Sequence, residues 1–140
     1  MFVLDTNVVS ELMLDRPHSA VLRWLDDRLE RDLFVTAVTQ AEVLTGIAIL
    51  PAGTRRQGLA AAADHAFGRM FADRVLPFDR LAAHSHAAIA AARRAAGRPI
   101  SQADCQIAAI AVAGGGTLVT RNVRDFDGIE IAVVNPWENA

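Results

Sequence analysis

The sequence contains no lysine, because all 14 of its basic residues are arginine. Lysine's titratable ammonium group forms Schiff bases, binds pyridoxal phosphate and contacts the phosphates in a Walker A loop. Arginine stays protonated and cannot replace lysine in these roles. Enzymes that depend on Schiff-base, pyridoxal-phosphate or Walker A chemistry are therefore excluded.

Cysteine and long apolar runs are also scarce. The single cysteine, Cys105, cannot form an intrachain disulfide, which fits a reducing cytoplasm. The longest uncharged stretch, 105–120, is broken by three glycines and is shorter than the ~20 apolar residues of a membrane-spanning helix. The N-terminus has no basic segment followed by a long apolar one, so no secretory signal is expected. We expect a cytoplasmic protein that makes no membrane contact.

The 140 residues suit one domain, which we expect to span residues 1–140. Hydrophobic residues make up 52% of the chain and charged residues 21%. There is enough apolar material for a buried core and too little charge for a disordered chain. The net charge of −2 does not by itself favour binding to nucleic acid.

Short apolar runs alternate with longer segments of helical spacing. The runs predict buried strands at 2–4, 33–35, 75–76, 118–119 and 131–134. The longer segments predict helices over 21–29, 43–50, 59–71 and 81–96. This alternation predicts an α/β fold with a mostly parallel central sheet and helices on both faces. Pro17 suits the first turn of a helix, and glycines 114–116 suit a helix end.

Acidic residues near the carboxyl ends of the strands are the first candidates for chemistry, because open parallel sheets bind ligands there. Asp5 directly follows the first expected strand, where it can also serve as a helix N-cap. Glu42 stands three residues after Thr39, and Asp104 stands three residues after Ser101. Both spacings match a capping box, in which the Glu42 carboxylate would reach back to the Thr39 N–H. Each acid taken singly has an ordinary structural explanation.

The three acids can nevertheless converge, because each is expected at a helix start on the same edge of the sheet. Two carboxylates ~4 Å apart repel by ~4 kcal/mol at an effective dielectric constant of ~20. An empty site would be strained or partly protonated. A hard divalent cation removes that conflict, and Mg²⁺ prefers carboxylate oxygen while keeping several waters.

At these positions the sequence resembles the PIN-domain ribonucleases of the VapC toxin family, and within them the FitB-like group. The resemblance extends over nearly all of the chain. It rests on segments that occur in this order: Val3-Leu4-Asp5-Thr6-Asn7-Val8-Val9-Ser10, Thr39-Gln40-Ala41-Glu42, Ile100-Ser101-Gln102-Ala103-Asp104, Ile107-Ala108-Ala109, Thr120-Arg121-Asn122, Asp125-Phe126 and Asn135-Pro136-Trp137. Together they are specific, although none is decisive alone.

The resemblance implies a PIN-like fold and a metal-dependent endoribonuclease that cleaves RNA with Mg²⁺ or, alternatively, Mn²⁺. Asp5 and Asp104 would bind the metal directly, and Glu42 would bind it or position a water. The resemblance also implies an antitoxin protein that blocks the site, either on a homodimer or in a hetero-oligomer. Apolar residues in segments 12–29 and 44–50, more than one small sheet can cover, support the homodimer.

The chain departs from the family pattern at the fourth acidic position. After Thr120-Arg121 the pattern often has Asp, whereas this chain has Asn122, followed three residues later by Asp125. Asn122 can still hold a water through its carbonyl oxygen, but the site loses a charge. Asp125 is the alternative, because three residues is about one helical turn. This departure argues against a two-metal mechanism.

Several other residues have a structural and a functional interpretation. The arginine clusters 93–98 and 121–124 are either solvated faces or phosphate contacts beside the acidic pocket. His84 and His86 would point ~200° apart on a helix, so they cannot bind one metal. Cys105 is expected to be a small packing residue.

Two rival functions belong to other classes. A haloacid-dehalogenase-like phosphotransferase would use Asp5 as nucleophile, but it needs a second Asp two residues on, where this chain has Asn7, and it needs a lysine. A non-catalytic PIN-like module would only bind a partner. Metal-dependent cleavage of RNA by the purified protein separates the three.

Overall fold

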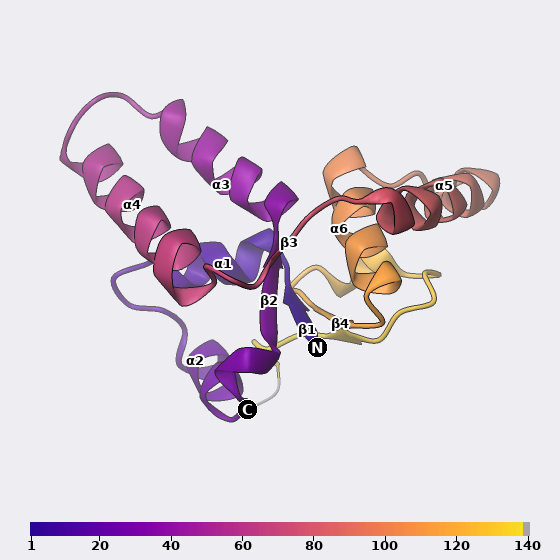
Figure 1. Cartoon of the computed structure of the whole chain (residues 1–140), viewed down its shortest axis with the longest axis horizontal. Coiled ribbons are helices and arrows are strands. Elements are labelled where there is room, and N and C mark those ends of the chain that lie inside the picture. The colour runs from indigo at the N-terminus through magenta and orange to yellow at the C-terminus, as the bar shows by residue number, and fades with distance from the viewer. Residues whose placement is uncertain (139–140) are drawn as a thin grey trace.

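The computed structural model describes residues 1–138, so the last two residues of the expected domain 1–140 lie outside the described residues. Within this range five strands form one sheet in the order β3-β2-β1-β4-β5 (Figure 1). They are β1 (Phe2–Leu4), β2 (Leu33–Thr36), β3 (Val75–Leu76), β4 (Thr117–Val119) and β5 (Val133–Val134). Every neighbouring pair is parallel. The expected α/β fold with a parallel central sheet is confirmed.

The first strand occupies the centre of the sheet. Val3 of β1 lies opposite Phe34 of β2 on one side and Leu118 of β4 on the other. Val3 and Leu4 have no exposed surface. Strands buried on both faces are continuous apolar runs, and this is why short runs such as 2–4 predicted the strands correctly.

Six α-helices connect and cover the strands of the described chain: α1 (Thr6–Leu12), α2 (Ser19–Asp26), α3 (Ala37–Ala48), α4 (Thr54–His65), α5 (Arg80–Ala95) and α6 (Gln102–Ala113). A π-helical turn, Ala66–Met70, continues α4, and 3-10 turns occupy Glu30–Asp32 and Val123–Phe126. In Figure 1, α3 and α4 form one arm of the molecule and α5 and α6 form the other. None of the helices in residues 1–138 has the length and apolar character needed to cross a membrane.

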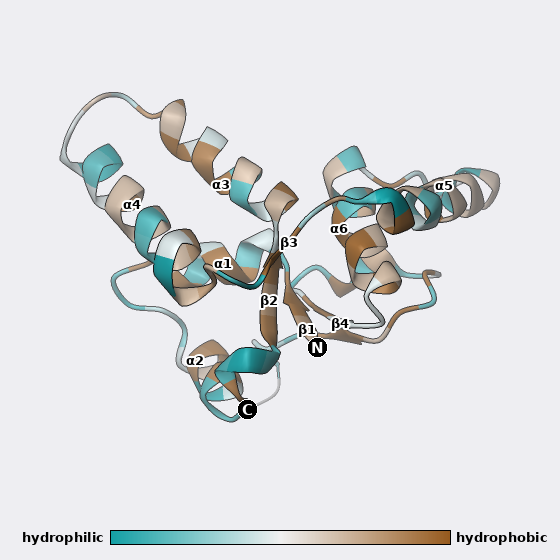
Figure 2. Cartoon of the chain, viewed as in Figure 1, coloured by the Kyte–Doolittle hydropathy of each residue, from teal (hydrophilic) through white to brown (hydrophobic). Residues whose placement is uncertain are grey.

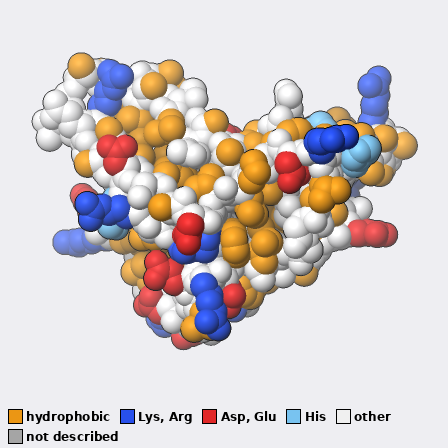
Figure 3. All heavy atoms as spheres, viewed as in Figure 1, with side chains coloured by type: hydrophobic (Ala, Val, Ile, Leu, Met, Phe, Trp, Pro, Cys, Tyr) orange, Lys and Arg blue, Asp and Glu red, His pale blue; other side chains and the backbone are white. Residues whose placement is uncertain are grey.

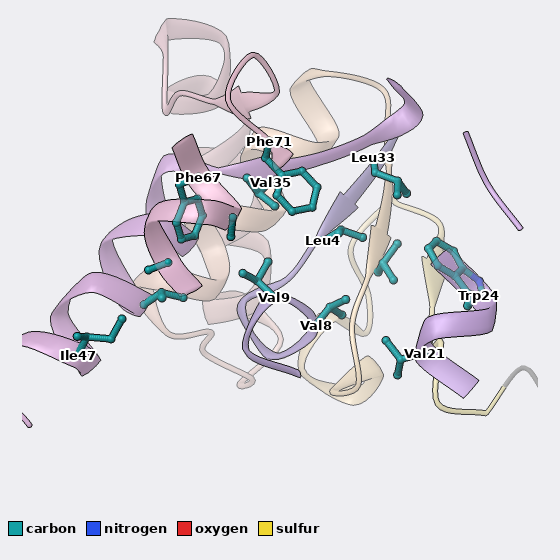
Figure 4. Packing of buried hydrophobic residues seen from close by; sticks show 14 residues of the cluster. Leu4, Val8, Val9, Val21, Trp24, Leu33, Val35, Ile47, Phe67 and Phe71 are labelled. Atoms are coloured by element: carbon teal, nitrogen blue, oxygen red, sulfur yellow. The ribbon is translucent and has the colours of Figure 1, made fainter. Parts of the chain in front are cut away.

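Apolar side chains pack on both faces of the sheet. One cluster joins Leu4 and Val119 to residues of α1, α2, α3 and α4, including Trp24 of α2, and to Phe71, which follows the π-helical turn (Figure 4). The other joins Leu118 to α5, α6 and Phe126. Successive residues of β4 therefore serve opposite faces, as the two-residue period of a strand requires. The strands are the most uniformly apolar ribbons in Figure 2, and helices cover both faces as expected.

The start of α3 differs from the expected capping box. Thr36, the last residue of β2, is the N-cap, and its hydroxyl accepts a hydrogen bond from the Thr39 N–H at 3.0 Å. The predicted start at Thr39 was therefore wrong by one helical turn. The strand passes straight into the helix because the buried Thr36 hydroxyl satisfies a free N–H at once.

The predicted helix start at Pro17 and the predicted helix end at glycines 114–116 had different outcomes. Pro17 does not lie in the first turn of α2, because His18 is the N-cap and its Nδ1 accepts a hydrogen bond from the Ala20 N–H at 3.1 Å. That prediction was wrong. Gly115 does end α6 with a left-handed φ of +68°, and the Gly116 N–H donates to the carbonyl of Ala111 at 2.9 Å. Only glycine adopts this φ without steric cost, so the helix end was correctly predicted.

Arg93 is neither a solvated residue nor a phosphate contact, so both interpretations of this member of the arginine cluster were wrong. It is 8% exposed on α5. Its Nε donates to the carbonyl of Arg98 at 2.7 Å, and its Nη1 donates to the carbonyls of Asp125 and Asp127 at 2.9 and 3.0 Å. The guanidinium therefore holds the segment after β4, which includes the 3-10 turn Val123–Phe126, against α5.

Replacing Arg93 should destabilise the fold. Arg93→Met leaves three carbonyls without their charged donor, and hydrogen bonds to charged groups contribute roughly 1.5–3 kcal/mol each, so we expect a loss of at least about 3 kcal/mol. Urea unfolding measures the loss. The matched control is Arg94→Ala, which removes the next residue of α5, an exposed arginine, and should change stability by less than about 0.5 kcal/mol. Equal effects would contradict the anchoring role of Arg93.

Candidate active site

Asp5 lies at the carboxyl end of the central strand and is only 4% exposed. Its backbone N–H continues the ladder to Val119 with a hydrogen bond of 2.8 Å. Its Oδ1 accepts from the Thr6 N–H at 2.8 Å, so Asp5 is the N-cap of α1. Its Oδ2 accepts from the Thr120 hydroxyl at 2.7 Å. Oδ2 also accepts from Nδ2 of Asn7 at 3.3 Å, which uses its second lone pair, whereas Oδ1 keeps one lone pair for the site. The carboxylate thus has both a capping role and a place in the site.

Thr120 connects the ends of β1 and β4. Besides donating to Asp5, its hydroxyl accepts from Nδ2 of Asn7 at 3.2 Å and from the Asn122 N–H at 3.1 Å. Asn7 Oδ1 accepts from the Arg121 N–H at 3.2 Å. These bonds fix the segment after β4 against the start of α1. The fully buried Thr120 hydroxyl uses its one hydrogen and both lone pairs.

Glu42 comes to the site from the middle of α3. The expected hydrogen bond from the Thr39 N–H to the Glu42 carboxylate does not form, because that N–H donates to the Thr36 hydroxyl. Instead, Glu42 Oε1 accepts from the Thr6 hydroxyl at 2.6 Å. The Thr6 hydroxyl also lies 3.0 Å from the hydroxyl of Thr39. Glu42 is therefore held by α1 and is exposed.

Asp104 comes to the site from the first turn of α6. Ser101 is the N-cap, and its hydroxyl accepts from the Asp104 N–H at 3.2 Å. This is the expected half of the capping box. The half-buried Asp104 side chain faces the pocket that Asp5 and Glu42 also line.

One open pocket of about 480 Å³ brings these residues together. Its walls are formed by Asp5, Thr6, Asn7, Ser10, Glu11, Leu14, Glu42, Asp104, Arg121, Asn122 and Trp137. Four carboxylates and a single arginine are among them. The predicted convergence of Asp5, Glu42 and Asp104 on one edge of the sheet is thus observed, although the three come from three different elements.

The donor set suits a hard divalent cation. Within residues 1–138 no three acidic, histidine or cysteine side chains are drawn close enough to hold an ion by themselves. Mg²⁺ does not require such a cage, because it keeps several waters and commonly takes one or two carboxylates together with substrate phosphate oxygens. Asp5 and Asp104 offer these carboxylates, and the pocket leaves room for water.

Comparison with known proteins agrees with this geometry. The PIN domain family model matches residues 2–131. The chain belongs to the PIN-domain family. It is 41% identical over 140 residues to the VapC ribonuclease Y4jK of Sinorhizobium fredii, with 100% of both chains covered. It is 36% identical to the toxin FitB of Neisseria gonorrhoeae, covering 99% of this chain and 100% of FitB.

The structure of FitAcB from Neisseria gonorrhoeae has the same fold. It superposes with a TM-score of 0.90 at 36% identity, covering 99% of each chain. This PIN domain is therefore a member of the VapC toxin ribonuclease family with a close similarity to FitB. The family resemblance predicted from the sequence is confirmed.

Two residues, Asn122 and Asp125, are candidates for the fourth acidic position of the PIN domain, and they lie in different surroundings. Asn122 lines the pocket and is tied to Thr120 through its backbone N–H. Asp125 is not part of the pocket wall, but it lies close enough to Asp104 to raise the pKa of that carboxyl. Asn122 therefore belongs to the pocket wall, whereas Asp125 acts on the site only through its charge.

The other polar candidates lie apart from the pocket, with one exception. Arg121 lines it, whereas Arg98 forms an ion pair with Asp127 at 3.6 Å. His86, on α5, packs its ring nearly at a right angle to the ring of Phe78, and neither His86 nor His84 lines the pocket. Cys105 is 2% exposed in the core, as expected of a packing residue.

Sequence reasoning missed the hydroxyl and amide side chains that hold the acids. Thr6, Asn7 and Thr120 were noted only as parts of motifs, yet each makes a direct hydrogen bond to an acid of the site. A signal was present, since Thr120 follows one expected strand just as Asp5 follows another. Only the pairing of β1 with β4 makes these two positions neighbours.

The carboxyl groups of Asp5 and Asp104 both have raised pKa values. Burial raises the pKa of the Asp5 carboxyl, and the charges of Asp104 and Glu42 raise it further, against the opposing hydrogen bonds from Thr120 and Thr6. Burial also raises the pKa of the Asp104 carboxyl, with Asp125 and Glu42 adding to the effect. The folded protein therefore holds protons at pH values where the unfolded chain has released them.

This raised pKa predicts a pH-dependent difference between the wild-type protein and Asp104→Asn in chelator. A raised carboxyl pKa gives stability that is complete below the unfolded value of about 4 and is lost as pH rises through the folded value. Asp104→Asn has no carboxyl to ionise at this position, so it does not lose this stability as the pH rises. Its melting temperature should therefore equal or exceed that of the wild type at neutral pH. The control Asp64→Asn changes an exposed acid on α4. A clear fall in stability of Asp104→Asn at pH 7 would show that Asp104 is only a cap.

Proposed function

We propose that this PIN domain is a metal-dependent endoribonuclease that acts as the toxin of a toxin–antitoxin pair and cleaves RNA phosphodiester bonds with Mg²⁺ or Mn²⁺. The observation that supports it most strongly is the gathering of Asp5, Glu42 and Asp104 from three elements round one open pocket. Membership of the VapC family and the similarity to a ribonuclease and a toxin support the same function.

The carboxylates of Asp5 and Asp104 would hold the metal ion. A divalent cation bound there would lower the pKa of a bound water and stabilise negative charge on the phosphate. Asp5 is fixed by hydrogen bonds to both of its oxygens, so it keeps its geometry when substrate binds. Glu42, which Thr6 holds by a hydrogen bond, would either bind the metal or position the attacking water. Asn122 offers a neutral oxygen on the same wall.

A phosphotransferase that uses Asp5 as nucleophile fits the contacts less well. Asp5 is 4% exposed, and its two oxygens accept hydrogen bonds from Thr6, Asn7 and Thr120. The amide at position 7 donates to Asp5, where the rival mechanism needs a second acid that protonates the leaving group. Both features weaken a nucleophile and suit a fixed ligand.

Asp104→Asn should abolish cleavage while the fold is retained. The amide keeps the shape of the carboxylate but removes a charge that the metal needs. The measurement is cleavage of an RNA ladder by purified protein with and without Mg²⁺ or Mn²⁺, with circular dichroism to check folding. Asp64→Asn serves again as the control. An active Asp104→Asn would rule out the ligand role, and an inactive wild-type protein would favour the non-catalytic module.

Variants at positions 122 and 125 test the fourth position. If Asn122 orients a water, Asn122→Ala should slow cleavage by roughly 10- to 100-fold, as loss of a group supporting a metal site does. Asn122→Asp should tighten metal binding because it adds a charge. Asp125→Ala should have a small effect. Loss of activity in Asp125→Ala together with a silent Asn122→Ala would assign the position to Asp125 instead, and metal titration of both variants measures this.

An antitoxin partner is supported by relatives, because the solved structures that this chain resembles include toxin–antitoxin complexes. The acidic pocket suits an arginine of that partner, since arginine forms paired hydrogen bonds with carboxylates. We propose that such an arginine enters the pocket, competes with the metal and blocks cleavage.

We also propose a homodimer. Apolar residues that a small sheet cannot cover remain exposed, including Leu29 and Ile49 at 56% and 78%. Figure 3 shows hydrophobic side chains gathered in the hollow between the arm of α3 and α4 and the arm of α5 and α6. Apolar side chains gathered on an exposed surface often mark an interface. Light scattering at micromolar concentration should give twice the 15.0 kDa mass of a single chain. A mass equal to that of one chain would contradict the proposal.

A further inference from the structure

One wall of the acidic pocket contains an aromatic ring that the proposed chemistry does not use. Trp137, in the segment after β5, lines the pocket together with Asp5 and Asp104. It is partly buried and also packs against the core cluster that contains Leu4 and Val8. The indole is therefore supported from behind by the core and still presents surface to the pocket.

Local hydrogen bonds fix the backbone turn that carries this ring. Oδ1 of Asn135 accepts from the backbone N–H of Trp137 at 2.9 Å, and Nδ2 of Asn135 donates to the carbonyl of Arg121 at 3.5 Å. Pro136 between them is buried. The Asn135-Pro136-Trp137 turn is thus tied to the end of β4, where the site begins. A ligand that stacks on a fixed ring loses little binding energy to ordering it.

Arg121 lies over the ring of Trp137 and is the only basic side chain among the residues that line the pocket. Its guanidinium carbon is 5.1 Å from the centre of the Trp137 ring, a looser contact than the 3.6 Å of Arg28 over Trp24. Within the described residues the Arg121 guanidinium makes no hydrogen bond or ion pair. It is exposed, so it can turn from the ring to a phosphate. This movement breaks only the cation–π contact and frees the ring face for a base.

We propose that Trp137 and Arg121 form a nucleotide subsite at the edge of the acidic pocket, in which an unpaired RNA base stacks on the indole and the adjoining phosphate bonds to the guanidinium. The proposal rests on the proposed ribonuclease function. Four carboxylates line the pocket and repel a polyanion, so a positive charge is needed where the RNA enters.

The subsite distinguishes unpaired RNA from paired RNA and does not distinguish one base sequence from another. Every base has a flat face, so stacking on an aromatic ring accepts all four. Bases in a duplex already stack on their neighbours, and unpaired bases in loops or single strands are the ones that reach protein aromatic rings. The structure therefore points to unpaired RNA as the preferred substrate.

Binding of a labelled single-stranded RNA octamer tests the stacking. It is measured by fluorescence anisotropy in the Asp104→Asn background, so that the RNA stays intact. Adding Trp137→Leu should weaken binding about tenfold, the size of one lost base stack, and Trp137→Phe should restore most of it. The matched control is Trp24→Phe, which changes the other tryptophan, 3% exposed in the core, and should leave the affinity unchanged.

An abasic nucleotide moved along the octamer identifies the stacked base. At one position it should weaken binding as much as Trp137→Leu does, and it should have no further effect in that variant. Arg121→Gln should instead lower the slope of log affinity against log salt by about 0.7, the contribution of one phosphate contact on a single strand. An abasic effect that persists in Trp137→Leu would overturn the proposal.

Intrinsic fluorescence provides a measurement that leaves Trp137 in place. In the Trp24→Phe variant Trp137 is the remaining tryptophan, and the octamer should quench its emission while a duplex of the same sequence should not. Equal quenching by both, or a Trp137→Leu variant that loses antitoxin binding but keeps RNA affinity, would overturn the proposal. Cleavage of RNA by the unaltered protein tests the ribonuclease function separately.

Discussion

Asp5 places a carboxylate at the end of the central strand, where 4% of the residue is exposed. A buried carboxylate is costly unless hydrogen bonds stabilise it. Thr120 and the start of α1 supply those bonds, and Thr120 is available only because β4 pairs with β1 in the observed register. The pairing of β4 with β1 therefore determines both the topology of the sheet and the hydrogen bonds that hold the Asp5 carboxylate. The remaining strain, from neighbouring acids, is what a divalent cation would relieve.

Hydrogen bonds from Arg93 and Thr6 hold the elements that form the rest of the pocket. Arg93, buried on α5, bonds the carbonyls of Asp125 and Asp127, and so fixes the segment that follows Asn122. On the other side Thr6 joins α1 to Glu42 on α3. The acids thus come from elements that are tied to one another by neutral or cationic donors. Such support is what keeps like charges in one pocket in the absence of a counter-ion.

Much of this arrangement was predictable from local pattern. Apolar runs of two to four residues predicted all five strands, because a parallel strand is buried on both faces and has to be apolar throughout. Asp5 and Asp104 were recognisable by their places after a strand and at a helix start. Helix boundaries were less predictable. Two threonines three residues apart, Thr36 and Thr39, can both cap a helix, and only the end of the buried strand β2 decides between them.

The sequence by itself determined the alternation of strands and helices, the types of side chain available for metal and phosphate chemistry, and the resemblance to a family, since these depend on composition and on spacing along the chain. The tertiary structure decided that Arg93 is an internal anchor and Arg121 a pocket residue, although both belong to arginine clusters that look alike in the sequence. It also decided that Trp137, far along the chain from Asp5, shares its pocket. The reason is that burial and proximity depend on which strands pair and which helix faces meet, and residues over a hundred positions apart contribute to that outcome together.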